Sequence, residues 1–113
     1  MILAGLVAAG MVAGQATPPR PRTDPKLWIR SEDYPVGVEN PRAHYSVGVR
    51  LSVSKQGRVT NCTVVRSSRI SEFDRVACRR LSSRGRFNPA RNARGRAIAG
   101  QIRMTVHWRL PED

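Results

Sequence analysis

The sequence predicts an α+β domain in which a three-stranded antiparallel sheet is packed on one face by one main helix. Three stretches carry this prediction: a two-stranded hairpin over 45–66, a helix over 71–85 and a last strand over 101–110. The hairpin and the last strand alternate apolar and polar residues, which is typical of half-buried strands, whereas the middle stretch repeats at three and four, which is typical of a helix. One sheet under one helical layer buries all three apolar rows.

The first strand of the hairpin has the clearest core face. Its apolar residues are Val47, Val49, Leu51 and Val53, and they alternate with Gly48, Arg50 and Ser52. The loop Lys55-Gln56-Gly57 offers polar residues and a glycine for a positive φ, as a short hairpin loop requires. The returning strand has its apolar residues at Val59, Cys62 and Val64, so the alternation slips by one residue around Thr60 and Asn61. This slip predicts a β-bulge.

The helix is expected to begin at Ser71 as N-cap, with Asp74 as its capping-box partner. Its apolar stripe consists of Phe73, Val76, Ala77 and Leu81, and Gly85 ends it. The segment 87–96 is expected to be a turn-rich connection. The last strand directs Ile102, Met104, Val106, Trp108 and Leu110 to one face and Gln101, Arg103, Thr105, His107 and Arg109 to the other, and Pro111 stops it.

The N-terminal third divides into two expected segments ahead of a domain over 34–113. Residues 1–16 form an uncharged apolar run that closes with Gly14-Gln15-Ala16, a small-x-small signal for cleavage. The run is shorter than the roughly 20 residues that span a bilayer, so we expect a signal peptide or a short membrane anchor; a buried apolar helix is the structural alternative. Residues 17–33 are rich in Pro and Arg and are expected to be an extended linker.

Charge narrows the range of partners. The 113 residues contain 20 Lys+Arg against 8 Asp+Glu, a net charge of +12, which favours nucleic acid, an anionic membrane surface or an acidic protein face. Nucleic acid is the less favoured of these, because the chain has only two Phe, two Tyr and two Trp for base stacking and its start resembles an export signal. We therefore expect an exported protein.

The two cysteines, Cys62 and Cys78, lie on the second strand and on the helix. An exported chain with an even number of cysteines is expected to form a disulfide, with two buried thiols as the alternative. Neither His44 nor His107 lies at a zinc-ligand spacing, so no metal or cofactor is expected. The two histidines and Lys55 have no spacing that favours acid–base catalysis, so we do not expect an enzyme.

Several short motifs together resemble the C-terminal domain of the TonB family. They are Tyr34-Pro35, Gly57-Arg58-Val59, Ser67-Ser68 followed by Phe73-Asp74, Phe87-x-Pro89-Ala90, Gly95 and Trp108-x-Leu110, in that order along residues 34–110. The resemblance implies a periplasmic domain that binds the TonB box of outer-membrane receptors. It also implies coupling to a proton-driven inner-membrane motor, so that receptors take up siderophores or other scarce nutrients. The alternative is an exported basic domain that binds nucleic acid or anionic envelope surfaces without transduction.

An edge strand explains how such a domain could bind a peptide. Unpaired N–H and C=O groups at a sheet edge can accept an extended peptide as a further strand. We expect this edge at Gln101, Arg103, Thr105, His107 and Arg109, with Tyr34 and Pro35 as further contacts. The alternative is an ordinary edge that its arginines protect from pairing. A homodimer is another state that the sequence leaves open.

Overall fold

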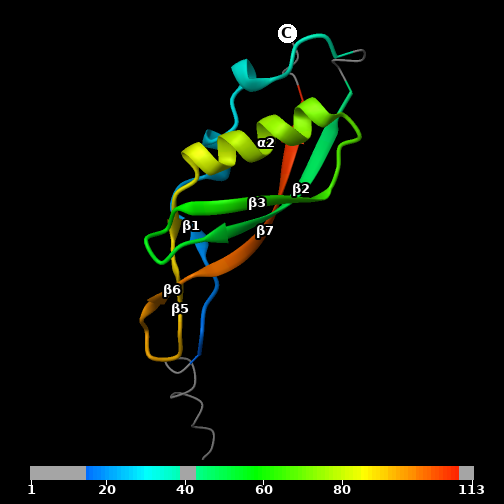
Figure 1. Cartoon of the computed structure of the whole chain (residues 1–113). Helices are drawn as coiled ribbons and strands as arrows, with labels where there is room; N and C mark the ends of the chain where they lie inside the picture. The colour runs from blue at the N-terminus through cyan, green and yellow to red at the C-terminus, as the bar shows by residue number, and fades with distance from the viewer. Residues whose placement is uncertain (1–14, 39–42, 110–113) are drawn as a thin grey trace, which may run out of the picture.

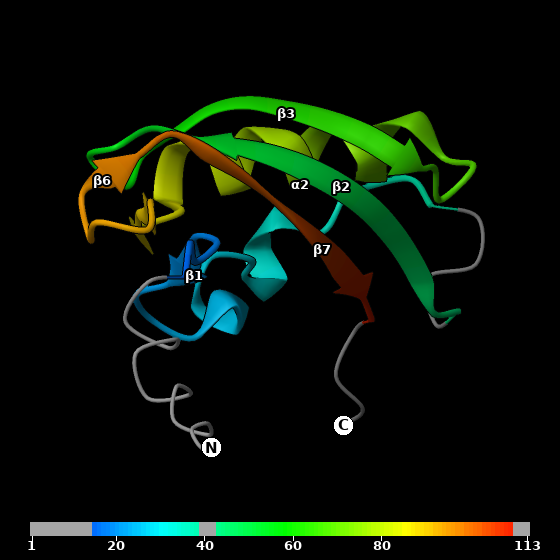
Figure 2. The ribbon, with the colours of Figure 1, turned by 90° about the horizontal axis from the view of Figure 1, so that it is seen from below.

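Strand β2 (Tyr45–Val53) is the centre of the molecule. The computed structural model of the protein describes residues 15–38 and 43–109, and in it β2 pairs with β3 (Val59–Arg66) on one side and with β7 (Gly100–Trp108) on the other, both antiparallel. The helix α2 (Ser71–Arg84) and the N-terminal segment cover one face of this sheet, and the other face is open (Figures 1 and 2). The predicted fold class is confirmed.

The hairpin loop closes as expected. Ser54 and Arg58 close the loop: the Ser54 amide donates to the Arg58 carbonyl at 2.8 Å, and Gly57 has a φ of 82°. A side chain at Gly57 would place its Cβ 2.0 Å from the carbonyl oxygen of Phe87, so both the turn and its neighbour require glycine.

Strand β3 contains two extra residues relative to β2. Ser52 pairs with Asn61 and Val53 with Val59, which leaves Thr60 as the bulged residue and confirms the predicted bulge. A second irregularity lies at the other end, where Gly48 pairs with Arg66 and Val49 with Val64. This second irregularity could not be predicted from the sequence. Val64 and Val65 are consecutive apolar residues, and the sequence does not show that Val65 is the exposed one.

The helix starts differently from the prediction. Ile70, not Ser71, is the N-cap and makes no side-chain cap, so the Ser71–Asp74 capping box is wrong. Asp74 instead accepts hydrogen bonds from the Ser68 amide and from the hydroxyls of Ser67 and Ser68, which lie in the turn before the helix. This earlier turn competes successfully for the carboxylate because two hydroxyls and one amide converge there. Gly85 does end the helix, as expected.

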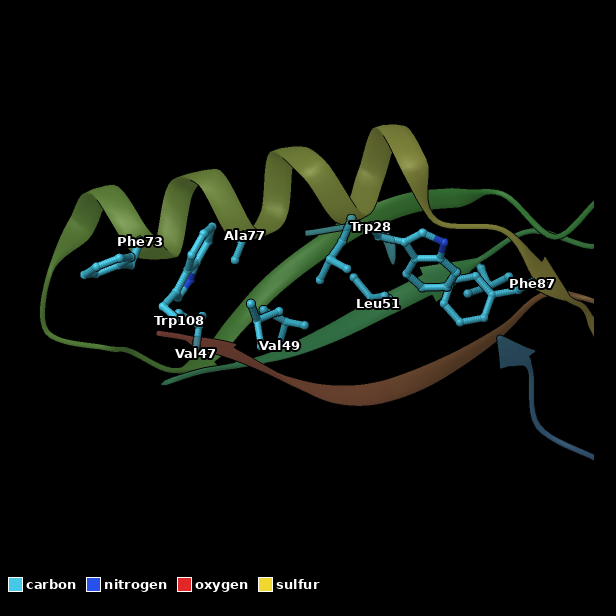
Figure 3. Packing of buried hydrophobic residues seen from close by; sticks show 11 residues of the cluster. Trp28, Val47, Val49, Leu51, Phe73, Ala77, Phe87 and Trp108 are labelled. Carbon is cyan, nitrogen blue, oxygen red and sulfur yellow. The ribbon is translucent and has the colours of Figure 1, made fainter. Parts of the chain in front are cut away.

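The core lies between α2 and the inner face of the sheet (Figure 3). Its fully enclosed residues come from the predicted rows on β2, α2 and β7, joined by Trp28 and Phe87, whose rings lie 5.3 Å apart. Burying such side chains stabilises a fold by about 1.5–3 kcal/mol each. The predicted apolar facing of β2, α2 and β7 is confirmed for the described residues, whereas Leu110 and Pro111 lie outside them.

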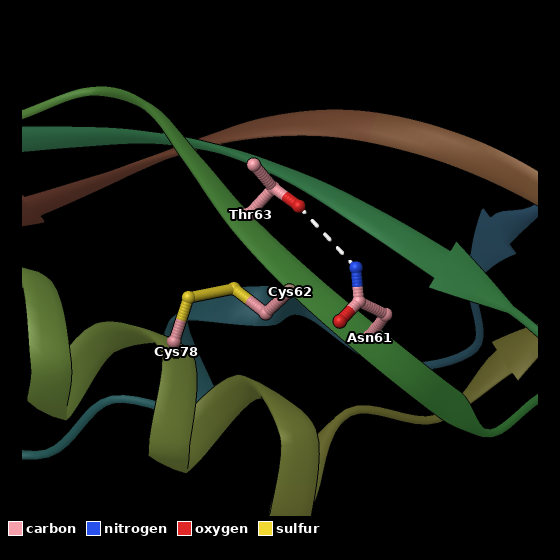
Figure 4. The surroundings of a disulfide bond; sticks show 4 residues. All are labelled: Asn61, Cys62, Thr63 and Cys78. Atoms are coloured by element: carbon pink, nitrogen blue, oxygen red, sulfur yellow. Dashed lines mark hydrogen bonds between the residues drawn. A yellow bond between two sulfur atoms is a disulfide. The ribbon is translucent and has the colours of Figure 1, made fainter.

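The predicted disulfide between Cys62 and Cys78 is present and joins β3 to α2 (Figure 4). The two Cα atoms lie 5.6 Å apart. On the same strand, the side-chain amide of Asn61 donates a hydrogen bond to the hydroxyl of Thr63 (Figure 4). The alternative of two free buried thiols is therefore excluded.

The segment expected to be an extended linker is docked on the domain. Strand β1 (Arg20–Pro21) pairs with β4 (Phe87–Asn88), and Thr17 forms a bridge with Arg91 of β5 (Ala90–Arg91), which itself pairs with β6 (Ala97–Ile98). Two short 3₁₀ helices follow, η1 (Pro25–Leu27) and η2 (Ser31–Asp33). The prediction for 1–16 falls mostly on residues outside the described part.

Aromatic and ionic contacts explain why this segment does not stay extended. Trp28 enters the core, and the Arg84 side chain donates hydrogen bonds to the Trp28 carbonyl at 2.9 Å and to Asp33 at 2.6 Å. Arg80 forms a second ion pair with Asp33, which is almost fully buried. The prolines and arginines of this segment predict an extended chain, but the sequence does not show that Asp33 pairs with Arg80 and Arg84 on the helix.

Candidate docking edge

Strand β7 forms one edge of the sheet. It pairs with β2 over nine consecutive residue pairs without a register shift, from Tyr45–Trp108 to Val53–Gly100, and with no other described strand. A regular strand with one unpaired side is the geometry that strand addition requires. The predicted edge at 101–109 therefore lies where a peptide could pair.

The hairpin determines which backbone groups of β7 face outward. The Ser54 amide donates to the carbonyl of Arg58, the residue directly before β3, so Ser54 directs its backbone groups toward that strand. Because this direction alternates along a strand, even-numbered residues of β2 direct their N–H and C=O groups to β3, and odd-numbered residues direct theirs to β7. Met104 pairs with odd-numbered Val49 and so bonds to β2, whereas Thr105 pairs with even-numbered Gly48. The N–H and C=O groups of Thr105 and of the other odd-numbered residues of β7 therefore face the free edge.

The polar side chains of β7 lie on the open face of the sheet. Gln101, Arg103, Thr105 and His107 are all exposed, in alternation with the inward row, and Arg109, the residue directly after β7, is exposed as well. The Gln101 amide lies 3.5 Å from the Ser52 hydroxyl, the limit of a hydrogen bond. His107 Nδ1 lies 3.0 Å from Nε2 of His44, and the ring centroids are 5.1 Å apart, so the two imidazoles share an N–H···N hydrogen bond.

Tyr34 and Pro35 have a different environment from the other predicted site residues. Both are half-buried, and the Tyr34 ring packs edge-on against Phe73 at 5.1 Å and Trp108 at 6.1 Å. Burial, with a smaller contribution from Tyr45, raises the pKa of Tyr34. The structure thus brings Tyr34 to the end of β7 as a packing residue, while the four predicted residues on β7 form a row along the strand.

An apolar groove lies beside β7 on the inner side of the sheet. It has a volume of about 530 Å³ and lies between the strand and η1. Ile29, Leu81, Met104 and Val106 are its apolar lining residues, and Asp24 and Lys26 lie at its polar margin. This groove could not be predicted from the sequence, because Ile29 and the η1 residues lie beside β7 only when the N-terminal segment is docked on the domain.

Two carboxylates, the buried Asp33 and the half-buried Asp74, stabilise the contacts of α2 with the segments beside it. Burial opposes ionisation of Asp33, but hydrogen bonds from Arg84 and from the Arg30 amide, together with the positive charge of Arg80, hold its pKa below the ordinary value. Burial likewise opposes ionisation of Asp74, and hydrogen bonds from Ser67 and Ser68 hold the pKa of that carboxyl below the ordinary value. Both side chains are therefore ionised at neutral pH.

The described residues offer little for other kinds of site. They contain no group of three or more side chains that could hold a metal ion. None of the helices in the described ranges has the length and apolar character needed to cross a membrane. What the geometry defines is a small α+β domain with one regular sheet edge and an apolar groove along it, the arrangement of a peptide-docking module.

The family of this module follows from its sequence. Residues 31–110 match the family described as Gram-negative bacterial TonB protein C-terminal, and because the match covers more than half of the chain, the protein belongs to that family. The suspected resemblance is confirmed. Domains of this family are non-catalytic, lie in the periplasm or envelope, and interact with TonB-dependent receptors in energy-coupled transport. No curated protein matches the chain.

Proposed function

We propose that this protein works in the periplasm and captures the TonB box of outer-membrane receptors by strand addition along β7, supporting uptake of siderophores or other scarce nutrients. The observation that carries the proposal is the regular edge of β7, whose odd-numbered residues direct their N–H and C=O groups away from β2. Coupling to the proton-driven inner-membrane motor belongs to the same proposal and rests on the family alone.

The two sides of the edge suggest the side chains that a captured peptide carries. Successive side chains of an added strand point alternately to the two faces of the sheet. Those on the inner side would enter the groove lined by Ile29, Leu81 and Met104, and those on the outer side would lie near Arg103. A peptide that alternates apolar with acidic or polar residues therefore fits this edge best.

The rival function, nucleic-acid binding through base stacking, lacks available rings. Trp28, Tyr34, Tyr45, Phe73, Phe87 and Trp108 all belong to the core cluster or pack against it. Bases stack on aromatic faces that are open to solvent. The basic charge alone would supply only sequence-independent contacts to phosphates.

The test is a proline scan of β7 with a synthetic peptide that carries the box of a TonB-dependent receptor. Thr105→Pro removes an outward-facing N–H and leaves the ladder to β2 intact, so the variant should fold and lose peptide binding. Thr105→Ala keeps the backbone and should bind nearly as the unchanged protein does. Met104→Pro removes an N–H that bonds to β2, so it should destabilise the fold itself.

Binding is followed by NMR, and folding of each variant by circular dichroism. Strand addition predicts that the amides of 101–109 shift on titration, with the largest changes at odd-numbered residues. Shifts confined to other strands, or a folded Thr105→Pro variant that binds normally, would contradict the proposal.

A further inference from the structure

The open face of the sheet is basic, and none of the described acidic side chains lies on it. The residues that the pairing places on this face are Ser46, Gly48, Arg50, Ser52, Asn61, Thr63, Arg66, Gln101, Arg103, Thr105 and His107. The acidic residues of the described part are Asp24, Glu32, Asp33, Glu72 and Asp74, which lie in the N-terminal segment and on α2. The acidic residues of the described part are thus confined to one side of the sheet, whereas arginines occur on both sides.

Two arginines lie directly opposite each other on this face. Arg50 of β2 pairs with Arg103 of β7, and by the alternation derived above they form a non-hydrogen-bonded pair, in which side chains approach most closely. Like charges at opposed positions destabilise a sheet. Neither arginine has an ion pair or a side-chain hydrogen bond in the described part of the chain, so no protein group compensates their repulsion.

Arg103 also joins two hollows of the open face. One, of about 430 Å³, is lined by Gly48, Arg66, Arg103 and Thr105 among others. The other, of about 280 Å³, is lined by Arg50, Arg103 and Gln101. Guanidinium groups and a hydroxyl therefore surround shallow space without a carboxylate, which is a set of donors for an oxyanion.

The paired charges indicate which oxyanion fits. A carboxylate or a phosphodiester carries one negative charge and would leave one of the two guanidinium groups uncompensated. A phosphomonoester carries about −1.5 to −2 charges at neutral pH and offers several acceptor oxygens to the forked donors of arginine. Two opposed arginines match this group in charge and in their number of hydrogen-bond donors.

We propose that the open face of the sheet binds phosphomonoester headgroups of a lipid surface through Arg50 and Arg103, with Arg66 beside them. The broad, nearly unobstructed face, seen above the rest of the chain in Figure 2, suits a surface better than a single small molecule. The inference can be separated from peptide capture, because Arg50 lies on the central strand and not on the docking edge, whereas Arg103 lies on that edge and is shared by both proposals.

The test is sedimentation of the protein with phosphatidylcholine vesicles that contain either phosphatidic acid, a phosphomonoester, or phosphatidylglycerol, a phosphodiester, at matched surface potential. The protein should prefer phosphatidic acid. The double variant Arg50→Gln/Arg103→Gln should lose roughly 30-fold in affinity and lose the preference, since each basic residue near an anionic surface contributes about 1 kcal/mol. Equal binding to both lipids would overturn the proposal.

A charge-matched control is available outside this face. The double variant Arg79→Gln/Arg94→Gln removes the same charge from α2 and from the β5–β6 turn, where both side chains are exposed, and it should retain the preference and most of the affinity. If it weakens binding as much as the first variant does, only net charge matters and the proposed site is wrong. Soluble inorganic phosphate is the second arm: full competition at low millimolar concentration would identify a free anion as the ligand and overturn the lipid assignment.

A stability measurement provides a readout without lipid. Removing one of the two opposed charges should raise the thermal midpoint at low salt, and added salt should reduce this difference. A lower midpoint for Arg103→Gln would show that the pair is not repulsive and would contradict the argument. Arg50→Gln on the central strand should weaken lipid binding and leave peptide capture unchanged, so failure of peptide capture and failure of lipid binding remain distinguishable.

Discussion

The two edges of the sheet are built in opposite ways. Strand β3 has two register irregularities and a disulfide to α2, whereas β7 pairs with β2 over nine consecutive residue pairs and has no covalent tie to another element. Bulges are one way in which natural sheets prevent unwanted pairing at an edge. The difference indicates that only β7 presents a regular ladder to an incoming strand, which is the basis of the proposed capture.

The largest loss of stability is expected from side chains of β2 and β7 that are buried in the shared core. Trp108→Ala or Leu51→Ala should lower the free energy of unfolding by about 2–5 kcal/mol, because both side chains are almost fully buried in the shared core. Urea denaturation measures the change. The control is Val65→Ala on β3, whose exposed side chain should contribute less than about 0.5 kcal/mol. Changes below 1 kcal/mol at both core positions would contradict the assigned facing of β7.

The next effect concerns the covalent anchor of β3. Replacing Cys62 and Cys78 together with serine should cost about 3 kcal/mol, because the bridge closes a loop with a sequence separation of 16. Hydrogen exchange should accelerate more on β3 than on β7, since only β3 loses its tie to the helix. Uniform acceleration on both strands would mean that the disulfide stabilises the sheet as a whole.

The smallest effect is expected on mild acidification. Because the folded-state pKa values of Asp33 and Asp74 lie below 3.8, their stabilisation is complete above that value and is lost as the pH falls through the folded pKa. Asp74 fastens the turn between β3 and α2, and Asp33 fastens the N-terminal segment to the helix. Urea midpoints measured from about pH 5 down to about pH 2 should therefore fall, and fall less in Asp33→Asn than in the unchanged protein.

The sequence predicted the elements that have a regular apolar period. The alternation on β2 and β7 and the spacing of Phe73, Ala77 and Leu81 determined the strands, the helix and the buried faces, because each pattern allows only one side to be buried. The row on β7 was also predictable as a candidate edge. Its outward N–H groups were not, since they depend on the hydrogen bonds of the hairpin.

Contacts between distant parts of the chain were beyond the sequence patterns. The N-terminal segment looked extended because of its prolines, yet Trp28 and Asp33 dock on residues more than 50 positions away. The groove beside β7 exists only because of that docking. The opposed arginines on the open face likewise required the register between β2 and β7, which periodicity alone does not give.

The docking of the N-terminal segment also has a mechanical consequence. Pro19 lies against the position of Gly100, where β7 begins, and Thr17 is bridged to Arg91 nearby. A pull on the chain ahead of Thr17 would therefore enter the domain at the starting end of β7. The part of such a load that runs along the strand would stretch its hydrogen bonds together, whereas a load across the strand would open them one after another. A peptide bound by the proposed strand addition on β7 would therefore resist tension along the strand best.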